Sequence, residues 1–226
     1  MRKTAVAIAI DGPAASGKTT AARMLARRLP ALYLDTGAMY RALAYLALRS
    51  QTDIDNEHAL LRISSRYKIR VQLDQEADLG FRVFAGTQEL GPELTSKEVT
   101  AVVSSVAAHP LVRDAMVQEQ RSIAKKGPVV MAGRDIGTVV LPDASCKIFL
   151  TASLAARVKR RREELLRAGV DADGHVLQEE ILERDRLDEN RSTSPLRAAR
   201  DAYIIDSSDM SAEEVVDAIL KHVQRV

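Results

Sequence analysis

The sequence predicts an α/β fold in which a five-stranded parallel sheet carries a small antiparallel β insertion. Near both ends of the chain, short apolar runs alternate with helical patterns, which is typical of parallel strands joined by crossover helices. Between them, residues 67–92 alternate polar with apolar side chains, which is typical of half-exposed antiparallel strands. A chain of 226 residues allows one domain with insertions or two small domains. Because no internal repeat or low-complexity linker is present, we expect one domain.

The composition excludes several classes of protein. An apolar fraction of 46% and a charged fraction of 28% argue against disordered, collagen-like and disulfide-scaffold chains. The net charge of +2, from 33 basic and 31 acidic residues, is too small for binding nucleic acid or membranes by bulk charge. We therefore expect neither partner, a monomer, and a local cluster of cations at any anion site.

The expected location is the cytoplasm. The single cysteine, Cys146, lies in an apolar run that predicts a buried place in a strand. The N-terminal apolar run, residues 4–10, is short and ends in Asp-Gly-Pro, which does not resemble a signal-peptide cleavage site. No run approaches the roughly 18 apolar residues that a membrane span needs.

The first 50 residues have the order βαβα. A β-branched apolar run predicts a strand buried on both faces, and Met24, Leu25 and Leu29 then recur at helical spacing. The expected elements are a strand at 5–10, a helix at 21–29, a strand at 31–34 and a helix that continues to about residue 49.

The alternation then breaks for the β insertion and two further helices. Thr95 and Glu98 have the spacing of a capping box, and Pro110 suits the first position of a helix. The expected elements are a helix at 56–66, strands at 68–73 and 80–85, a helix that starts near Val99, and a helix from Pro110 to about Gly127.

The βα alternation resumes in the second half of the chain. The expected elements are strands at 129–132, 147–150 and 202–206, a strongly basic helix at 157–167, a charged helix at 179–191 and an amphipathic helix at 213–223.

Residues 12–19 match the phosphate-loop pattern G-x-x-x-x-G-K-[ST], and they lie between a predicted strand and a predicted helix. In such a loop, backbone N–H groups and the helix dipole bind phosphates, whereas a plain glycine-rich turn would lack this context. Lys18 is expected to reach the β- and γ-phosphates of a nucleoside triphosphate, and Thr19 to offer its hydroxyl to Mg²⁺. The expected nucleotide-binding residues are Gly12, Pro13, Ala14, Ala15, Ser16, Gly17, Lys18, Thr19 and Thr20.

The phosphate loop does not identify the acceptor, because GTPases, transporters and small-molecule kinases share it. No Asn-Lys-x-Asp string for guanine recognition is present, which argues against a switch protein. A kinase whose acceptor is itself a phosphate needs several fixed cations, and the forked guanidinium suits this task. The candidates are Arg41, Arg113, Arg134, Arg184 and Arg191. Taken alone, each of these residues is more typical of a solvated or salt-bridged surface arginine than of a phosphate ligand. Arg41 and Arg134 follow predicted strands, and ligands bind at the carboxyl ends of parallel strands.

Three further motifs accompany the phosphate loop at residues 11–19. They are Leu-Asp-Thr-Gly-Ala-Met-Tyr-Arg at 34–41, Ala-Gly-Arg-Asp-Ile-Gly-Thr at 132–138 and Glu-Arg-Asp-x-x-Asp-x-x-Arg at 183–191. In these motifs and their order the chain resembles the bacterial cytidylate kinases almost from end to end. The resemblance implies the P-loop nucleoside monophosphate kinase fold and transfer of the γ-phosphoryl group of ATP to CMP or dCMP.

Position by position, the resemblance also implies roles for single residues. The implied catalytic residues are Lys18, Arg41, Arg134 and Arg191, of which the three arginines bind the acceptor phosphate. The implied sugar-binding residues are Arg184 and Asp188, and those around the base are Thr36, Ser104, Arg113 and Asp135. Threonine stands at position 36, where serine is also common in the family, so the hydroxyl is kept and a methyl group is added.

Chemistry supports the base-binding role of Asp135 independently. The exocyclic amino group of cytosine is a hydrogen-bond donor, and a carboxylate accepts from it. Uracil presents an oxygen at that position, so a buried Asp135 would be left unpaired beside it. The residue is therefore expected to favour CMP over UMP.

The basic helix has two readings. Arg157, Arg160 and Arg161 fall on one helical face, and the resemblance implies that this helix belongs to a lid over ATP, with Arg157 and Arg160 as ATP-binding residues. The alternative is an ordinary solvated helix. The expected parts are a core at 1–50, 96–152 and 192–226, an acceptor-binding insertion at about 51–95 and a lid at about 153–191.

Two alternatives for function stay open, an ATP-binding regulatory module and a kinase for another small acceptor such as UMP. Asp35, after the second strand, is equally suited to a magnesium-bound water or to capping the next helix. The four histidines stand outside the motifs, so surface or packing roles are expected for His58, His109, His175 and His222.

Overall fold

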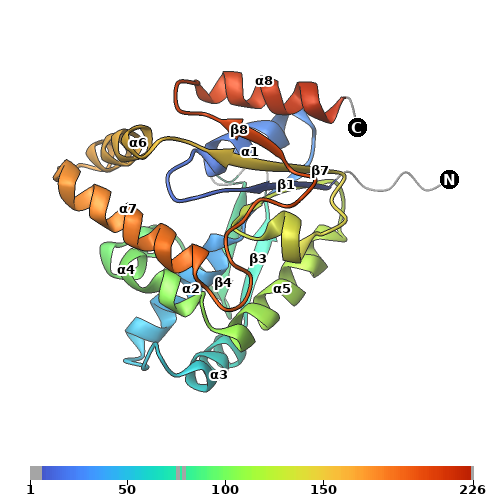
Figure 1. The fold of residues 1–226 in the computed structure, drawn as a ribbon. Helices are drawn as coiled ribbons and strands as arrows, with labels where there is room; N and C mark the ends of the chain where they lie inside the picture. Colours follow the sequence, from blue (N-terminus) through green and yellow to red (C-terminus); the bar gives the residue numbers. More distant parts are fainter. Residues whose placement is uncertain (1–6, 75–76, 78–79, 225–226) are drawn as a thin grey trace.

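The computed structural model describes residues 7–74, 77 and 80–224, and its centre is a sheet of parallel strands (Figure 1). The order is β2-β6-β1-β7-β8, and every neighbouring pair is parallel. The strands are β1 (Ala7–Asp11), β2 (Leu32–Asp35), β6 (Val129–Gly133), β7 (Cys146–Thr151) and β8 (Tyr203–Asp206). The predicted five-stranded parallel core is confirmed.

Position in the sheet explains which strands are apolar throughout. β1 and β6 are flanked on both sides, and Ile8, Ile10 and Val130 have no exposed surface. β8 lies at an edge, where Ile204 is 59% exposed. Cys146, the first residue of β7, is buried as predicted, and burial raises the pKa of its thiol to about 11.

Helices cover both faces of this sheet. Helices α1 and α8 pack together on one side, and α2 to α5 lie on the other (Figure 1). The helices are α1 (Lys18–Arg28), α2 (Gly37–Arg49), α3 (Glu57–Tyr67), α4 (Lys97–Val106), α5 (Pro110–Ala124), α6 (Leu154–Arg167), α7 (Gly174–Glu189) and α8 (Ala212–Val223). Helices α6 and α7 pack against each other and project beyond one end of the sheet (Figure 1).

The insertion forms a second, antiparallel sheet with the order β3-β4-β5. Its strands are β3 (Ile69–Leu73), β4 (Phe81–Ala85) and β5 (Gln88–Leu90), and β3 and β4 pack against α2. Burial alternates along β3 and β4, which confirms the two predicted strands. The third strand was not predicted separately, because three residues are too few for an alternating pattern.

Several helix boundaries differ from the prediction for local reasons. α6 begins at Leu154 and α7 at Gly174, upstream of the predicted 157 and 179, because side chains cap them there. Ser153 Oγ accepts from the N–H of Ala156 at 3.3 Å, and Asp173 Oδ1 accepts from the N–H of His175 at 2.7 Å. α7 ends at Glu189, so Arg191 follows the helix instead of closing it.

The predicted capping box at Thr95 is wrong by one residue. Ser96 caps α4, since its Oγ accepts from the N–H of Val99 at 3.3 Å. Thr95 instead belongs to the 3-10 turn η1 (Pro92–Thr95), where its hydroxyl donates to Pro92 O at 3.0 Å. A π-helical turn, η2 (Ile136–Val140), follows β6 and was also not predicted.

In the part of the chain that the structure describes, no helix is both long and apolar enough to cross a bilayer. The predicted division into core, insertion and lid stays a prediction.

Candidate active site

The phosphate loop joins β1 to α1, as its sequence context predicts. Gly12 has φ of 151°, and a Cβ there would lie 2.0 Å from the carbonyl oxygen of Leu150. No other residue fits this close approach to β7. Helix α1 begins at Lys18, three residues before the predicted start, so the loop ends at the N-terminus of a helix. This placement gives the loop the backbone donors and dipole that phosphate binding requires.

Lys18 is buried and folded back across its own loop. Its Nζ donates to Pro13 O at 2.5 Å and to Ser16 Oγ at 3.2 Å. Burial, followed by the nearby charge of Arg134, lowers the pKa of Lys18 well below its usual value. A phosphate beside this ammonium group would replace neutral oxygens with a charged partner.

Thr19 and Asp35 face each other across the start of α1. Thr19 Oγ1 donates to Asp35 Oδ2 at 3.4 Å, and Asp35 Oδ1 accepts from the N–H of Gly37 at 2.9 Å. One oxygen of Asp35 therefore bonds to the first residue of α2, while the other faces Thr19. A hydroxyl and a carboxylate are ligands that suit Mg²⁺, which usually keeps waters and phosphate oxygens as its other ligands. The described residues contain no group of three or more His, Cys, Asp or Glu placed to hold a metal.

Four of the candidate arginines gather near Lys18 around two carboxylates. Arg41 Nη1 lies 3.5 Å from Asp35 Oδ2. Arg134 Nε donates to Asp188 Oδ2 at 2.7 Å, and Arg191 Nη1 lies 3.9 Å from Asp188 Oδ1. Although burial opposes it, the charges of Arg134 and Arg191 lower the pKa of Asp188.

Arg184 completes this cluster without a carboxylate of its own in hydrogen-bond distance among the described residues. Burial, with the charges of Arg134 and Arg41, lowers its pKa to about 9. Two buried donors, Arg184 Nε and Arg191 Nη2, have no hydrogen-bond partner in the described part of the chain. Unpaired buried donors and a surplus of cations are both costly, and a bound dianion would relieve both. The cluster is therefore suited to bind an anion.

A second group of predicted residues lies beside this cluster. Arg113 pairs with Asp135 inside the protein, donates to Ala107 O at 3.0 Å and places its guanidinium 5.4 Å from the ring centroid of Tyr40. Thr36 Oγ1 donates to Ala132 O at 3.0 Å. Ser104 is buried on α4, which packs against α2 and α7. The structure thus joins Arg113 directly to Asp135, although 22 positions separate them in the chain.

The basic helix α6 holds the outer side of the phosphate loop. Arg157 is buried, pairs with Asp185 of α7 and donates to Ala14 O at 3.2 Å. Arg160 donates to Ser16 O at 3.3 Å and to Ser207 Oγ at 3.0 Å. Arg161, on the same face in the sequence pattern, instead forms a surface pair with Glu164 at 3.0 Å. Two of the three arginines therefore contact the loop backbone.

Sequence reasoning missed two carboxylates that hold the site together. Asp11 accepts from the N–H groups of Ile136 and Gly137 at 2.8 and 2.7 Å, and burial is the main cause that raises its pKa to about 6. It ties the start of the phosphate loop to the turn after Arg134 and Asp135. Asp185 accepts from the N–H of Ala14 at 3.1 Å. The sequence feature that could have identified Asp185 was its spacing of one helical turn from Asp188 on α7.

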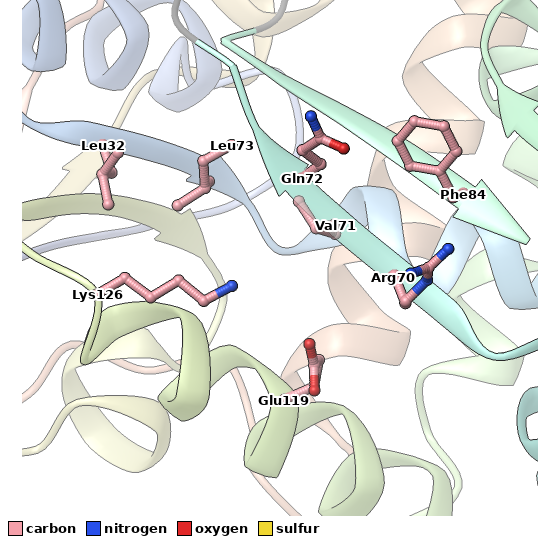
Figure 2. A pocket seen from close by; sticks show the side chains of 8 residues that line it. All are labelled: Leu32, Arg70, Val71, Gln72, Leu73, Phe84, Glu119 and Lys126. Carbon is pink, nitrogen blue, oxygen red and sulfur yellow. The ribbon is translucent and has the colours of Figure 1, made fainter. Parts of the chain in front are cut away.

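A cavity of about 560 Å³ lies elsewhere, between β3 and the C-terminal half of α5 (Figure 2). Figure 2 shows Glu119 and Lys126 on one side and Arg70 and Val71 of β3 on the other. None of the predicted site residues lines it. The candidate active site is instead the surface between the phosphate loop, the end of β6 and α7, where the arginines converge.

Comparison with known proteins gives a consistent result. Residues 8–225 match a protein family described as cytidylate kinase. A cytidylate kinase from Geobacillus sp. (strain WCH70) is 48% identical over 218 residues, which are 96% of each chain. One from Bacillus cereus (strain ATCC 10987 / NRS 248) is 47% identical over 221 residues, 98% of this chain and 97% of that one.

Among solved structures, an uncharacterized protein from Eubacterium ventriosum ATCC 27560 is similar in fold. Its TM-score is 0.53 at 14% identity, and the match covers 99% of this chain and 100% of the other. At this identity the likeness concerns the fold alone.

Proposed function

This chain belongs to the cytidylate kinase family, and from that premise we propose that it transfers the γ-phosphoryl group of ATP to CMP or dCMP. The products are ADP and CDP or dCDP. The observation that carries the proposal beyond family membership is the arginine cluster beside Lys18, which has an excess of cations and two buried unpaired donors. A kinase whose acceptor is a nucleoside monophosphate must hold two anionic groups together, and this cluster is suited to the second of them.

The loop residues 12–20 bind ATP in this proposal, with Lys18 on its β- and γ-phosphates. Thr19, with Asp35 facing it, would hold the Mg²⁺ that accompanies ATP. When bound, Mg²⁺ supplies positive charge to the phosphates. Arg41, Arg134 and Arg191 bind the acceptor phosphate and, with Lys18, balance the charge that develops during an in-line transfer.

Little covalent chemistry falls to the protein in phosphoryl transfer, so its residues act by position and charge. Asp188 supports this role, because it bonds to Arg134 and lies beside Arg191. In the proposal Asp188 and Arg184 hold the sugar as well. Bound CMP would offer sugar and phosphate oxygens to Arg184 Nε and Arg191 Nη2, two buried donors without a hydrogen-bond partner among the described residues.

Base selection is assigned to Asp135 with Arg113, Thr36 and Ser104. Asp135 accepts from the cytosine amino group, and the ion pair with Arg113 orients that carboxylate. Uracil would place an oxygen against a buried carboxylate, which costs binding energy.

We also propose a monomer that works in the cytoplasm. The single buried cysteine, which forms no internal disulfide, supports the location in a reducing compartment. Size-exclusion chromatography with light scattering measures the molar mass in solution, and a mass of two or more chains would contradict the monomer.

The decisive experiment is a substrate panel. The protein is mixed with ATP, Mg²⁺ and CMP, dCMP, UMP or AMP in turn, and the diphosphate formed from each acceptor is measured by chromatography together with the ADP formed from ATP. We expect kcat/KM to be highest for CMP or dCMP. A protein that binds ATP without forming a diphosphate would be a regulatory module, and faster turnover of UMP would overturn the base-site assignment.

A further inference from the structure

Asp185 lies where the phosphate loop, α6 and α7 meet. It is buried, its Oδ1 accepts from the N–H of Ala14 at 3.1 Å, and its Oδ2 pairs with Arg157. Arg157 in turn donates to the carbonyl oxygen of the same Ala14 at 3.2 Å. Both backbone polar groups of one loop residue are therefore held by a single buried ion pair that comes from two helices.

This arrangement constrains the loop next to residues with unusual backbone dihedral angles. Ala15, the next residue, has φ of 57°, and Gly17 has φ of 91°, so the chain turns through left-handed conformations immediately after Ala14. A non-glycine residue in this region costs free energy, and surrounding contacts must hold it in place. The Asp185–Arg157 pair supplies such contacts from outside the loop.

α7 carries a second carboxylate one turn away that serves the other half of the site. Asp188 bonds to Arg134 and lies near Arg191, whereas Asp185 bonds to the phosphate loop. The spacing of three residues puts both carboxylates on one helical face. The acceptor arginines and the donor loop are thus attached to α7 at successive turns.

We propose that Asp185 is a positioning residue for ATP, which acts through Ala14 and Arg157 to hold the phosphate loop in its binding conformation. Arg157 then serves ATP binding by fixing the loop, because its charge is already paired with Asp185. The inference rests on the proposed ATP-dependent function. It differs from the direct contact between Arg157 and ATP that the sequence resemblance implied.

The test measures ATP and CMP binding separately by calorimetry in wild type, Asp185→Asn and Asp185→Ala. The asparagine keeps an oxygen for the Ala14 N–H and loses the charge, whereas alanine loses both. We expect the Kd for ATP to rise about threefold to tenfold in Asp185→Asn and more in Asp185→Ala, with the Kd for CMP within about twofold of wild type. Glu183→Gln is the matched control, because Glu183 forms an exposed pair with Arg186 on the same helix, and it should bind both nucleotides normally.

A double-mutant cycle with Arg157→Met separates the two roles of Arg157. If the pair acts as a unit, the effects of Asp185→Asn and Arg157→Met on ATP affinity are not additive. Additive effects would overturn the inference, because Arg157 would then act on ATP by itself. Equal losses for ATP and CMP, or a lower melting temperature with unchanged Kd values, would also overturn it. Failure of the wild-type protein to form CDP, with these binding differences intact, would instead contradict the proposed function.

Discussion

The phosphate loop and the arginine cluster hold positive charge in different ways. Lys18 is bonded to oxygens of its own loop, no more than five positions away in the chain. The arginines come from α2, the end of β6, α7 and the segment that follows it. Arg134 bonds to Asp188, 54 positions away, whereas Arg41 and Arg191 lie near carboxylates in their own segments. Their charges are only partly compensated, as the lowered pKa of Arg184 indicates. The ammonium group of Lys18 is therefore bonded within its own loop, whereas the guanidinium groups are brought together from separate segments and keep an excess of positive charge.

This difference predicts distinct responses to mutation, and the largest is expected at Lys18. In Lys18→Ala, kcat/KM for CMP phosphorylation should fall about 10²- to 10³-fold, because the ammonium group is the main cation of the loop. The melting temperature should stay near that of wild type, since the buried charge is costly in the free protein. Coupled-assay kinetics and a thermal melt check both. Lys126→Ala, at an exposed lysine after α5, is the control, and equal activity in the two variants would contradict the prediction.

The next largest effect is expected at Arg184, where the excess positive charge of the cluster destabilises the folded protein. The lowered pKa means that the charged guanidinium destabilises the folded state at every pH below about 9. Arg184→Met should therefore raise the free energy of unfolding by about 1 kcal/mol. The KM for CMP should rise about 10- to 100-fold, since a charged donor to the substrate is lost.

Urea denaturation and steady-state kinetics test the two effects together. A destabilised Arg184→Met protein with an unchanged KM would show that Arg184 is an ordinary structural residue. Addition of CMP should raise the melting temperature of wild type more than that of the variant, because binding adds RT ln(1 + [L]/Kd) to stability.

A smaller effect concerns the base site. Asp135→Ala should reduce the ratio of kcat/KM for CMP over UMP about tenfold, because no carboxylate then rejects the uracil oxygen. Loss of Asp135 also leaves Arg113 buried without its partner, so overall activity should fall for both substrates. The specificity ratio, measured in one mixture of CMP and UMP, is the informative quantity. A ratio equal to that of wild type would remove Asp135 from base selection.

The last prediction concerns stability, and it is made at Asp11, which links the phosphate loop to the turn after Asp135. The raised pKa of Asp11 means that its carboxyl group holds the proton more tightly in the folded protein than in the unfolded chain. This carboxyl group therefore stabilises the folded state most below pH 3.8. The stabilisation is lost as the pH rises through about 6. The free energy of unfolding of wild type should therefore fall by about 1–3 kcal/mol between pH 4 and 6, relative to Asp11→Asn. Denaturation curves at several pH values measure the difference. Parallel pH profiles for the two proteins would show that Asp11 does not titrate in this range.

Most of the core could be predicted from the sequence, because its signals are local. The apolar runs of β1 and β6 and the alternation along β3 and β4 each occupy a few consecutive residues. Helix starts were predicted less well. Ser153 and Asp173 cap their helices with one and two side-chain hydrogen bonds, which leave little trace in the hydrophobic pattern.

The residues of the candidate site also divide into those with a local sequence signal and those without one. By itself the sequence determined the phosphate loop, since its glycines, Lys18 and Thr19 act within one turn of chain between a strand and a helix. It also named Arg41, Arg134, Arg184 and Arg191, which stand in short motifs, whereas Arg113 and Arg157 were assigned through the family resemblance. Only the tertiary structure decided their partners: Asp188 for Arg134, Asp135 for Arg113 and Asp185 for Arg157. The physical reason is that a buried charge is stable only beside groups that compensate it, and those groups come from whichever segments the fold brings within a few ångströms.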